Sequence, residues 1–468
     1  MQRSLSLLML VLPVLLHAQA PQTTFYPIKE PFSESLDAPV VTTDYVIAPQ
    51  GTRDNESSGV NMLVLDRVTK EQVALGGCGV DFGPVYYEGM AVTRTSAIVF
   101  FRGHDPKERQ GLMFARKYKL PSLEPEGPAI VVAKYPFPNG RNMVSSEYRF
   151  KIYRSADDSK FLVTSLLNFP EKKVHEYGCW AFNSNLEPLW DHMLHYDQPK
   201  GHRIEQSSVV ITESGVAYIA FNPLSLELKP DKGVPSDPAP ELQPFIVRLD
   251  AQGTKQRALK LQAGHSTFGM KLVLKGDGLV AGGFECANLK KGNADAVYIW
   301  ELKPDLEEKA PAVSVALNNP EEHKPRITFM VPTADGFAFA GRTLEQLMLV
   351  RVNEQLVKTG EVTTPFGDIW WTMQFGNSGG NAVVTFYDYP KNIENLNTGK
   401  GLRNSVGYLM EPGYCILDAN GKLKCGQMVT DTDAVRDILN FRTETFRLGV
   451  YADRIHGSKP GIIVTEWR

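Results

Sequence analysis

Histidines outside the predicted strands are the residues of this chain best placed for acid–base chemistry. His104 precedes Asp105, and His265 lies between Gly264 and Ser266, in stretches that we interpret as loops. An imidazole in a loop can take up or release a proton near neutral pH. The sequence assigns no serine or cysteine nucleophile to either histidine. Both are therefore predicted as candidates for a binding face and not as members of a catalytic triad.

Three further histidines, His192, His195 and His202, lie close together in the sequence. Along a strand, an offset of three residues points the first two side chains to opposite faces, so the geometry for a shared metal ion is poor. His202 is a candidate for the binding face. The sequence has no Cys-x-x-Cys pair, and Asp431 and Asp433 lack the other oxygen ligands of a calcium loop. We therefore expect no metal ion and no cofactor.

Two aromatic residues complete the candidate binding face. Trp371 follows Trp370 at the start of a predicted strand, where alternation turns one ring into the core and the other to the opposite face. Tyr389 lies at the start of a long insertion. An exposed ring at such a place can stack on a sugar or a peptide. The alternative is that both tryptophans pack against neighbouring sheets.

These side chains must be positioned by a unit that recurs from about residue 150 to residue 430. Each unit has short apolar strands separated by Gly or Asp-Gly steps, an interruption, and two last strands joined by a tight polar turn. Alternating apolar residues bounded by Gly, Asn and Asp indicate sheet rather than helix. The five clearest units have their last turns at 183–185, 250–253, 303–305, 353–355 and 418–421. Each unit is interpreted as a four-stranded antiparallel meander.

Such meanders can bury their faces only against one another, which predicts an all-β fold of the β-propeller type. A sixth unit covers residues 90–134. Residues 61–73 and the strands near 446–451 and 461–465 each look like half a unit, and together they would make a seventh. We therefore predict seven four-stranded blades, with six or eight possible, closed by pairing N-terminal and C-terminal strands in one blade.

The segment from Ser155 to Val163, Ser-Ala-Asp-Asp-Ser-Lys-Phe-Leu-Val, resembles the Ser-Pro-Asp-Gly-Lys strand opener of TolB-like bacterial propellers. The likeness covers one blade, and Pro and Gly are both replaced. It implies a β-propeller and nothing about the ligand. The repeat signatures of WD40, kelch and quinoprotein propellers are absent from the sequence.

Insertions fall mainly between the second and third strands of the units. The clearest occupy residues 222–243 and 388–410, and shorter ones occupy 103–110 and 285–294. In a propeller these loops share one rim with the links between blades. Long loops in a compact domain are often functional, so this rim is the predicted binding face. The alternative is length variation that the fold tolerates on its solvent side.

Cysteine placement predicts one disulfide. Across the turn at 419–421, Leu417 pairs with Leu423 and Cys415 with Cys425, so the two sulfur atoms face each other. Directly opposed strand residues are close to disulfide spacing. The alternative is a pair of buried thiols. Cys78, Cys179 and Cys286 lie far apart and are interpreted as buried apolar residues.

The sequence of residues 1–20 predicts a signal peptide. Arg3 precedes the apolar run Leu5 to Leu16, and cleavage is expected after Ala18 or Ala20. Residues 21–468 then form a single propeller domain, exported to the periplasm or the medium, without a transmembrane segment. The formal net charge of −3 over 468 residues indicates no nucleic-acid partner.

Three functions fit these features. The first is a non-catalytic binding or scaffold module for an unidentified protein, peptide or glycan through the loop-bearing face. The second is a hydrolase or lyase that acts on glycans or peptides, which would need acids, Tyr or His converging on the axis of the propeller. The third is a structural component of an envelope or secretion assembly.

Overall fold

The computed structural model gives a strand-built chain in which no helix occurs among the described residues. None of these residues therefore belongs to a helix long and apolar enough to cross a membrane. The described residues are 22–28, 39–50, 59–83, 85–136, 150–169, 174–197, 202–225, 243–261, 265–267, 269–286, 294–318, 327–342, 346–365, 373–378, 381–388, 411–417, 423–427, 443–444, 447–452 and 461–466. The predicted signal peptide lies outside them.

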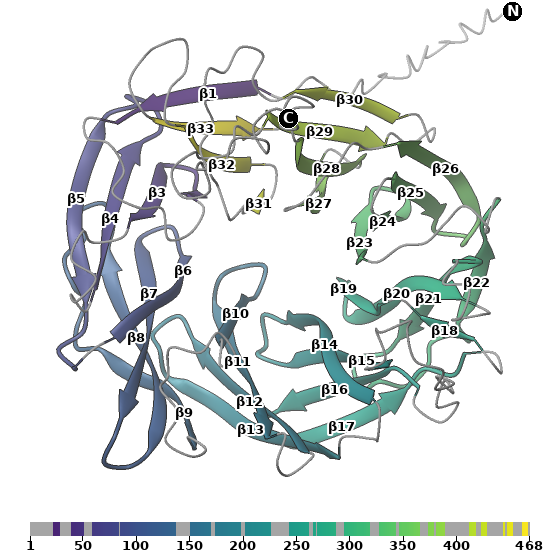
Figure 1. The fold of residues 1–468 in the computed structure, drawn as a ribbon, viewed down its shortest axis with the longest axis horizontal. Helices are drawn as coiled ribbons and strands as arrows, with labels where there is room; N and C mark the ends of the chain where they lie inside the picture. The colour runs from purple at the N-terminus through teal and green to yellow at the C-terminus, as the bar shows by residue number, and fades with distance from the viewer. Residues whose placement is uncertain are drawn as a thin grey trace, which may run out of the picture.

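Eight antiparallel sheets, formed by the described residues, stand around a common axis and make the predicted β-propeller (Figure 1). In most blades the strands follow one another as a meander, and the first strand lies nearest the centre of the ring in Figure 1. We call these first strands the axial strands. The count of eight is the upper end of the predicted range.

The first four blades are regular meanders. Blade 1 contains β2 (Val40–Val41), β3 (Tyr45–Gln50), β4 (Gly59–Asp66) and β5 (Gln72–Gly79). Blade 2 contains β6 (Val85–Val92), β7 (Ser96–Asp105), β8 (Gln110–Lys119) and β9 (Ile130–Pro136). Blade 3 contains β10 (Phe150–Arg154), β11 (Lys160–Phe169), β12 (Val174–Asn183) and β13 (Pro188–Asp197). Blade 4 contains β14 (His202–Ile211), β15 (Ala217–Ser225), β16 (Phe245–Asp250) and β17 (Gly253–Ala258).

In blade 5 the axial strand is split in two, and both parts pair with the same second strand. The strands are β18 (Ser266–Thr267), β19 (Lys271–Lys275), β20 (Gly278–Cys286), β21 (Ala296–Leu302) and β22 (Val313–Ala316). Blade 6 contains β23 (Ile327–Thr333), β24 (Gly336–Arg342), β25 (Gln346–Asn353) and β26 (Lys358–Pro365). Blade 7 contains β27 (Met373–Ser378), β28 (Asn381–Asp388), β29 (Glu411–Leu417) and β30 (Leu423–Gln427).

Blade 8 joins the two ends of the chain, as predicted, but with different strands. Its order is β31 (Thr443–Glu444), β32 (Arg447–Ala452), β33 (Gly461–Glu466) and then β1 (Gln22–Pro27). Strand β1 pairs antiparallel with β33 along its whole length. The expected pairing of residues 61–73 with the C-terminal strands is wrong, because that segment belongs to blade 1. The sequence-based count of seven missed β1 and the very short β2.

The burial of each strand follows from its place in the blade. The second strand β20 is buried on both faces along almost its entire length, because blades pack face to face on either side of it. The outermost strand β5 instead alternates between half-buried and exposed residues. This difference explains why second strands have continuous apolar sequences while outer strands alternate.

Apolar side chains fill the spaces between neighbouring blades. Six buried clusters each join two successive blades, from blades 1 and 2 to blades 6 and 7. Between blades 4 and 5, for example, Tyr218 and Ile246 meet Leu279 and Trp300. Full burial of one such side chain stabilises the fold by about 1.5 to 3 kcal/mol. The ring is therefore held together mainly at the interfaces between blades.

A leucine with left-handed backbone closes the turn between the third and fourth strands in several blades. Leu186, Leu306 and Leu356 have φ of +65°, +67° and +59°, and the N–H of each donates to the carbonyl three residues earlier. Leu306 is fully buried and packs in the cluster between its own blade and the preceding one. Leu186 and Leu356 pack in the same way in blades 3 and 6. We call these residues turn leucines.

The register predicted for the last turn of blade 7 is confirmed for the pairs that the structure describes. Leu417 pairs with Leu423, and Cys415 with Cys425. The disulfide itself stays a prediction. Cys78, Cys179 and Cys286 are buried, as expected of small apolar side chains.

Candidate functional site

One rim of the propeller carries the links between blades and the connections from second to third strands. Strands β15, β20 and β28 end here at Ser225, Cys286 and Asp388, where the insertions begin. The axial strand β14 also begins on this rim, at His202. We call it the insertion rim. The opposite rim, which carries the short turns within blades, is the turn rim.

A histidine–carboxylate pair lies on the insertion rim of blade 5. Nδ1 of His265, the residue just before β18, lies 2.6 Å from Oε1 of Glu285, near the end of β20. The Glu285 side chain is 2% exposed and the His265 side chain 24%. The pairing of Thr267 with Glu285 in the β18–β20 ladder brings the two residues together.

Ser314 satisfies the second oxygen of the same carboxylate. Its hydroxyl, on the outer strand β22, donates to Oε2 of Glu285. Both carboxylate oxygens therefore have a partner, which offsets the several kcal/mol that burying an unpaired charge costs. Because Ser314 donates to the carboxylate and not to the imidazole, the three residues do not form a serine nucleophile with its base.

The backbone between the two parts of the axial strand of blade 5 packs closely against strand β20. Gly283 is required there, since a Cβ at this position would lie 2.0 Å from the carbonyl oxygen of Gly269. The Thr267 hydroxyl donates to the carbonyl of Phe284 at 2.9 Å. Burial raises the pKa of the neighbouring Tyr298 hydroxyl; Thr267 opposes this rise and the charge of Glu285 adds to it.

Two buried polar side chains from the flanking blades border Gly269. Asn222 comes from β15 of blade 4 and Thr328 from β23 of blade 6, and they are 4% and 3% exposed. Each lies within 4 Å of the position that a Cβ on Gly269 would occupy. Among the described residues, Oδ1 of Asn222 and the Thr328 hydroxyl have no hydrogen-bond partner. The polar site thus extends from blade 5 to both neighbours.

The pair determines which imidazole nitrogen carries the proton. An ionised carboxylate only accepts hydrogen bonds, so the proton of a neutral His265 ring belongs on Nδ1 and the lone pair on Nε2. Nε2 can accept a hydrogen bond from a ligand hydroxyl or amide, or accept a proton. In the part of the chain that the structure describes, no group of three His, Cys, Asp or Glu side chains is arranged to hold a metal ion.

The structure describes some of the residues predicted for the binding face and not others. The loop predicted for His104 is wrong, because this residue pairs with Gly111 near the end of β7 and is half-buried. His202 is the first residue of β14, paired with Ser225. Both are on the insertion rim with His265, but in blades 2 and 4. Trp371 and Tyr389 lie outside the described residues, as do Trp370 and the acidic pair Asp431 and Asp433.

The histidines near residue 195 contact separate partners. The Nε2 atom of His192 lies 2.7 Å from the carbonyl oxygen of Asp250, in blade 4. The Nδ1 atom of His195 lies 3.3 Å from Glu176, on the neighbouring strand of its own blade. The two side chains thus point apart, as the strand alternation predicts.

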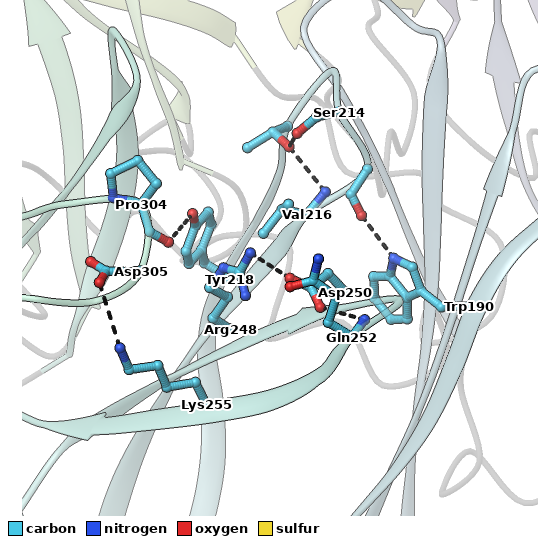
Figure 2. Close-up of polar contacts among 12 residues, drawn as sticks. Trp190, Ser214, Val216, Tyr218, Arg248, Asp250, Gln252, Lys255, Pro304 and Asp305 are labelled. Carbon is cyan, nitrogen blue, oxygen red and sulfur yellow. Dashed lines mark hydrogen bonds and ion pairs between the residues drawn. The ribbon is translucent and has the colours of Figure 1, made fainter.

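On the turn rim, polar contacts join blades 3, 4 and 5 (Figure 2). The indole N–H of Trp190 donates to the carbonyl of Gly215 at 2.8 Å, and the Tyr218 hydroxyl donates to the carbonyl of Pro304 at 2.7 Å. Arg248 forms an ion pair with Asp250. The two hydrogen bonds of Trp190 and Tyr218 end on backbone carbonyls of turns in the next blade, so their role is to hold neighbouring blades in place. The ion pair of Arg248 and Asp250 lies within strand β16.

The fold and this site define the molecule as a β-propeller protein with a polar site on one rim. Neither a family model nor a curated protein matches the sequence. The chain is similar to the WD40 domain of SCAP from fission yeast, with 7% identity over 96% of this chain and 94% of that one, and a TM-score of 0.41.

Two other solved structures show similar likeness. The β-propeller domain of the Trilobed protease from Pyrococcus furiosus has 10% identity, covers 86% of this chain and 99% of its own, and gives a TM-score of 0.39. A prolyl endopeptidase has 13% identity over 76% of this chain, with a TM-score of 0.39. The present chain spans 46% of that enzyme's chain. These likenesses concern the fold alone, and the TolB-like resemblance of Ser155 to Val163 stays a prediction.

Proposed function

We propose that the protein is an exported, non-catalytic binding propeller that holds a peptide, protein or glycan on the insertion rim, with His265 as a polar anchor. The observation that carries this proposal is the buried pair of Glu285 and His265 beside the strand ends from which the insertions begin. Export to the periplasm or the medium rests on the apolar leader of residues 1–20.

The position of Glu285 supports a binding role because the fold does not need a charge there. The rest of β20 is apolar or glycine, and an apolar residue at position 285 would avoid the desolvation of a carboxylate. The carboxylate instead holds the imidazole in one orientation with Nε2 turned away from it. Such a preoriented acceptor recognises a hydroxyl or N–H group at a low cost in side-chain entropy.

Binding to printed arrays of glycans and of peptides tests the proposal. We expect a ligand that binds the native protein and binds His265→Ala and Glu285→Gln about 2- to 10-fold more weakly, equivalent to the loss of one neutral hydrogen bond of about 0.5 to 1.5 kcal/mol. His195→Ala is the matched control, because His195 also pairs with a glutamate but lies on an outer strand. Equal binding by all variants, or no binding on either array, contradicts the proposal.

A hydrolase or lyase acting on the same ligands is the second candidate. It is favoured by one observation: Nε2 of a histidine backed by a carboxylate is a suitable general base. Incubation of the bound array members with the protein distinguishes the two functions. New reducing ends or amines that form with native protein but not with His265→Ala would establish catalysis, and intact ligands would establish binding alone.

A further inference from the structure

A β-bulge in the axial strand of blade 4 turns polar groups toward blade 5. The β14–β15 register shifts between Gln206 and Ser208, which leaves Ser207 out of the ladder. The Ser207 hydroxyl donates to the carbonyl of Met270 at 2.8 Å, and its carbonyl accepts from Nζ of Lys271 at 2.8 Å. The bulge therefore fixes the position of the Lys271 ammonium group beside strand β14.

Lys271 has few partners for its charge. Its ammonium carries three N–H donors, of which one is used by Ser207, and it lies 5.8 Å from the centre of the Phe329 ring. Among the described residues, no carboxylate lies within ion-pair distance of it. Lys275, on the same strand and also over an aromatic ring, differs in this respect, because it reaches Glu301 and Glu354 at 3.9 and 3.7 Å.

A second lysine lies on the neighbouring axial strand β10 of blade 3, which meets β14 where the Gln206 amide donates a hydrogen bond to the Tyr153 hydroxyl at 2.6 Å. Lys151 is exposed on the axial strand β10, and Glu205 is exposed on the axial strand β14 between the two lysines. Burial and the charge of Lys151 lower the pKa of Lys271, and Glu205 opposes this effect. Strands β10, β14 and β19 follow one another around the centre of the ring (Figure 1). Two cations and one anion thus lie on the axial strands of three successive blades.

We propose that Lys151 and Lys271 form an oxyanion-binding site on the axial strands of blades 3 and 5, which takes a carboxylate, sulfate or phosphate group. The two free N–H donors of Lys271 and the ammonium of Lys151 provide charge-assisted hydrogen bonds to such a group. A bound anion neutralises the repulsion between the lysines. The proposal does not depend on the function proposed for the insertion rim.

Titration with sodium sulfate, sodium phosphate and sodium glucuronate at constant ionic strength, with chloride as the balancing salt, tests this site. Isothermal calorimetry and the amide shifts of residues 205–208 and 270–272 are the measurements. We expect saturable binding to the native protein, at least tenfold weaker binding to Lys271→Met and to Lys151→Gln, and unchanged binding to Lys275→Gln and His265→Ala.

The three anions distinguish the source of the group. Binding of sulfate or phosphate without glucuronate indicates a free inorganic anion, and binding of glucuronate indicates the acidic group of a larger ligand. Lys271→Met retains the length of the side chain, and the exposed Lys151→Gln provides a second variant that does not depend on a buried substitution. Equal affinity of the native protein and both variants, or no saturable binding of any anion, overturns the proposal.

Discussion

Nδ1 of His265 lies 2.6 Å from Oε1 of Glu285, so the carboxylate sets the tautomer of the imidazole. In the neutral ring we expect a protonated Nδ1 and an unprotonated Nε2. Long-range ¹⁵N–¹H NMR of the histidine rings measures this directly. Glu285→Gln should remove the preference for the tautomer that is protonated at Nδ1, and the spectrum should then show both tautomers. A native spectrum with the proton on Nε2 would show that the hydrogen bond is not made in solution.

The turn leucines should stabilise the protein although their backbone is strained. Leu306→Gly relieves a left-handed conformation worth about 1 to 2 kcal/mol but empties a fully buried site, for which truncation costs about 2 to 5 kcal/mol. We expect a net loss of up to about 4 kcal/mol in the free energy of unfolding, measured in urea.

Lys70 is the matched control for this prediction. It has φ of +61° in the corresponding turn of blade 1, but its side chain is exposed. Lys70→Gly should therefore leave the stability unchanged or raise it by up to about 1 kcal/mol, because only the strain is removed. If both glycine variants stabilise the protein, the buried leucine is not what holds the blades together.

Asp335 should contribute a pH-dependent part of the stability. Its Oδ1 accepts a hydrogen bond from the buried Arg351 at 2.5 Å. Burial acts to raise the pKa of Asp335, but the hydrogen bonds and the charge of Arg351 outweigh it and hold the pKa below the ordinary value of 3.8. The stabilisation is therefore fully present above pH 4 and is lost as the pH falls through the lowered pKa.

Asp335→Asn is the variant that measures this contribution. At pH 7 we expect a loss of about 1 to 2 kcal/mol, reduced from that of a fully buried pair because the Asp335 side chain is 45% exposed. Urea unfolding at pH 7 and pH 3 should show the gap between native protein and variant narrowing in acid. A gap that is the same at both pH values would mean that the ionised carboxylate is not responsible.

Cys415 and Cys425 pair across neighbouring strands, and the disulfide between them stays a prediction. Cys415→Ser should lower the melting temperature under oxidising conditions and leave it unchanged in the presence of a reductant. A small loop of this kind contributes about 2 to 3 kcal/mol. Free-thiol counting of the unfolded native protein is the independent check, and five reactive thiols without reductant would refute the bond.

The propeller could be predicted because its evidence is local. Alternating strands and polar turns repeat within short windows, and the register around Cys415 and Cys425 follows from one turn. The N-terminal strand β1 escaped prediction, since Gln22–Pro27 has three polar residues and a proline and gains its strand structure only from pairing with β33. Pairing across more than four hundred residues leaves no local pattern.

Only part of the candidate site could be predicted, because contacts between distant strands leave no local pattern. His265 could be identified as a loop histidine, but its partner depends on the β18–β20 register, which no turn connects. One signal for Glu285 was present, namely a carboxylate in the otherwise apolar or glycine sequence of Gly278–Cys286. The partners of Lys271 come from three different blades and follow only from the closed ring.

The union of β1 with β33 also constrains the order of events during synthesis. The first strand of the ring to be made can find its place only after the last one has been made. Until then the growing chain has two unfinished edges at once, and each is able to pair with another molecule. Completion of blade 8 therefore removes two pairing edges in a single step.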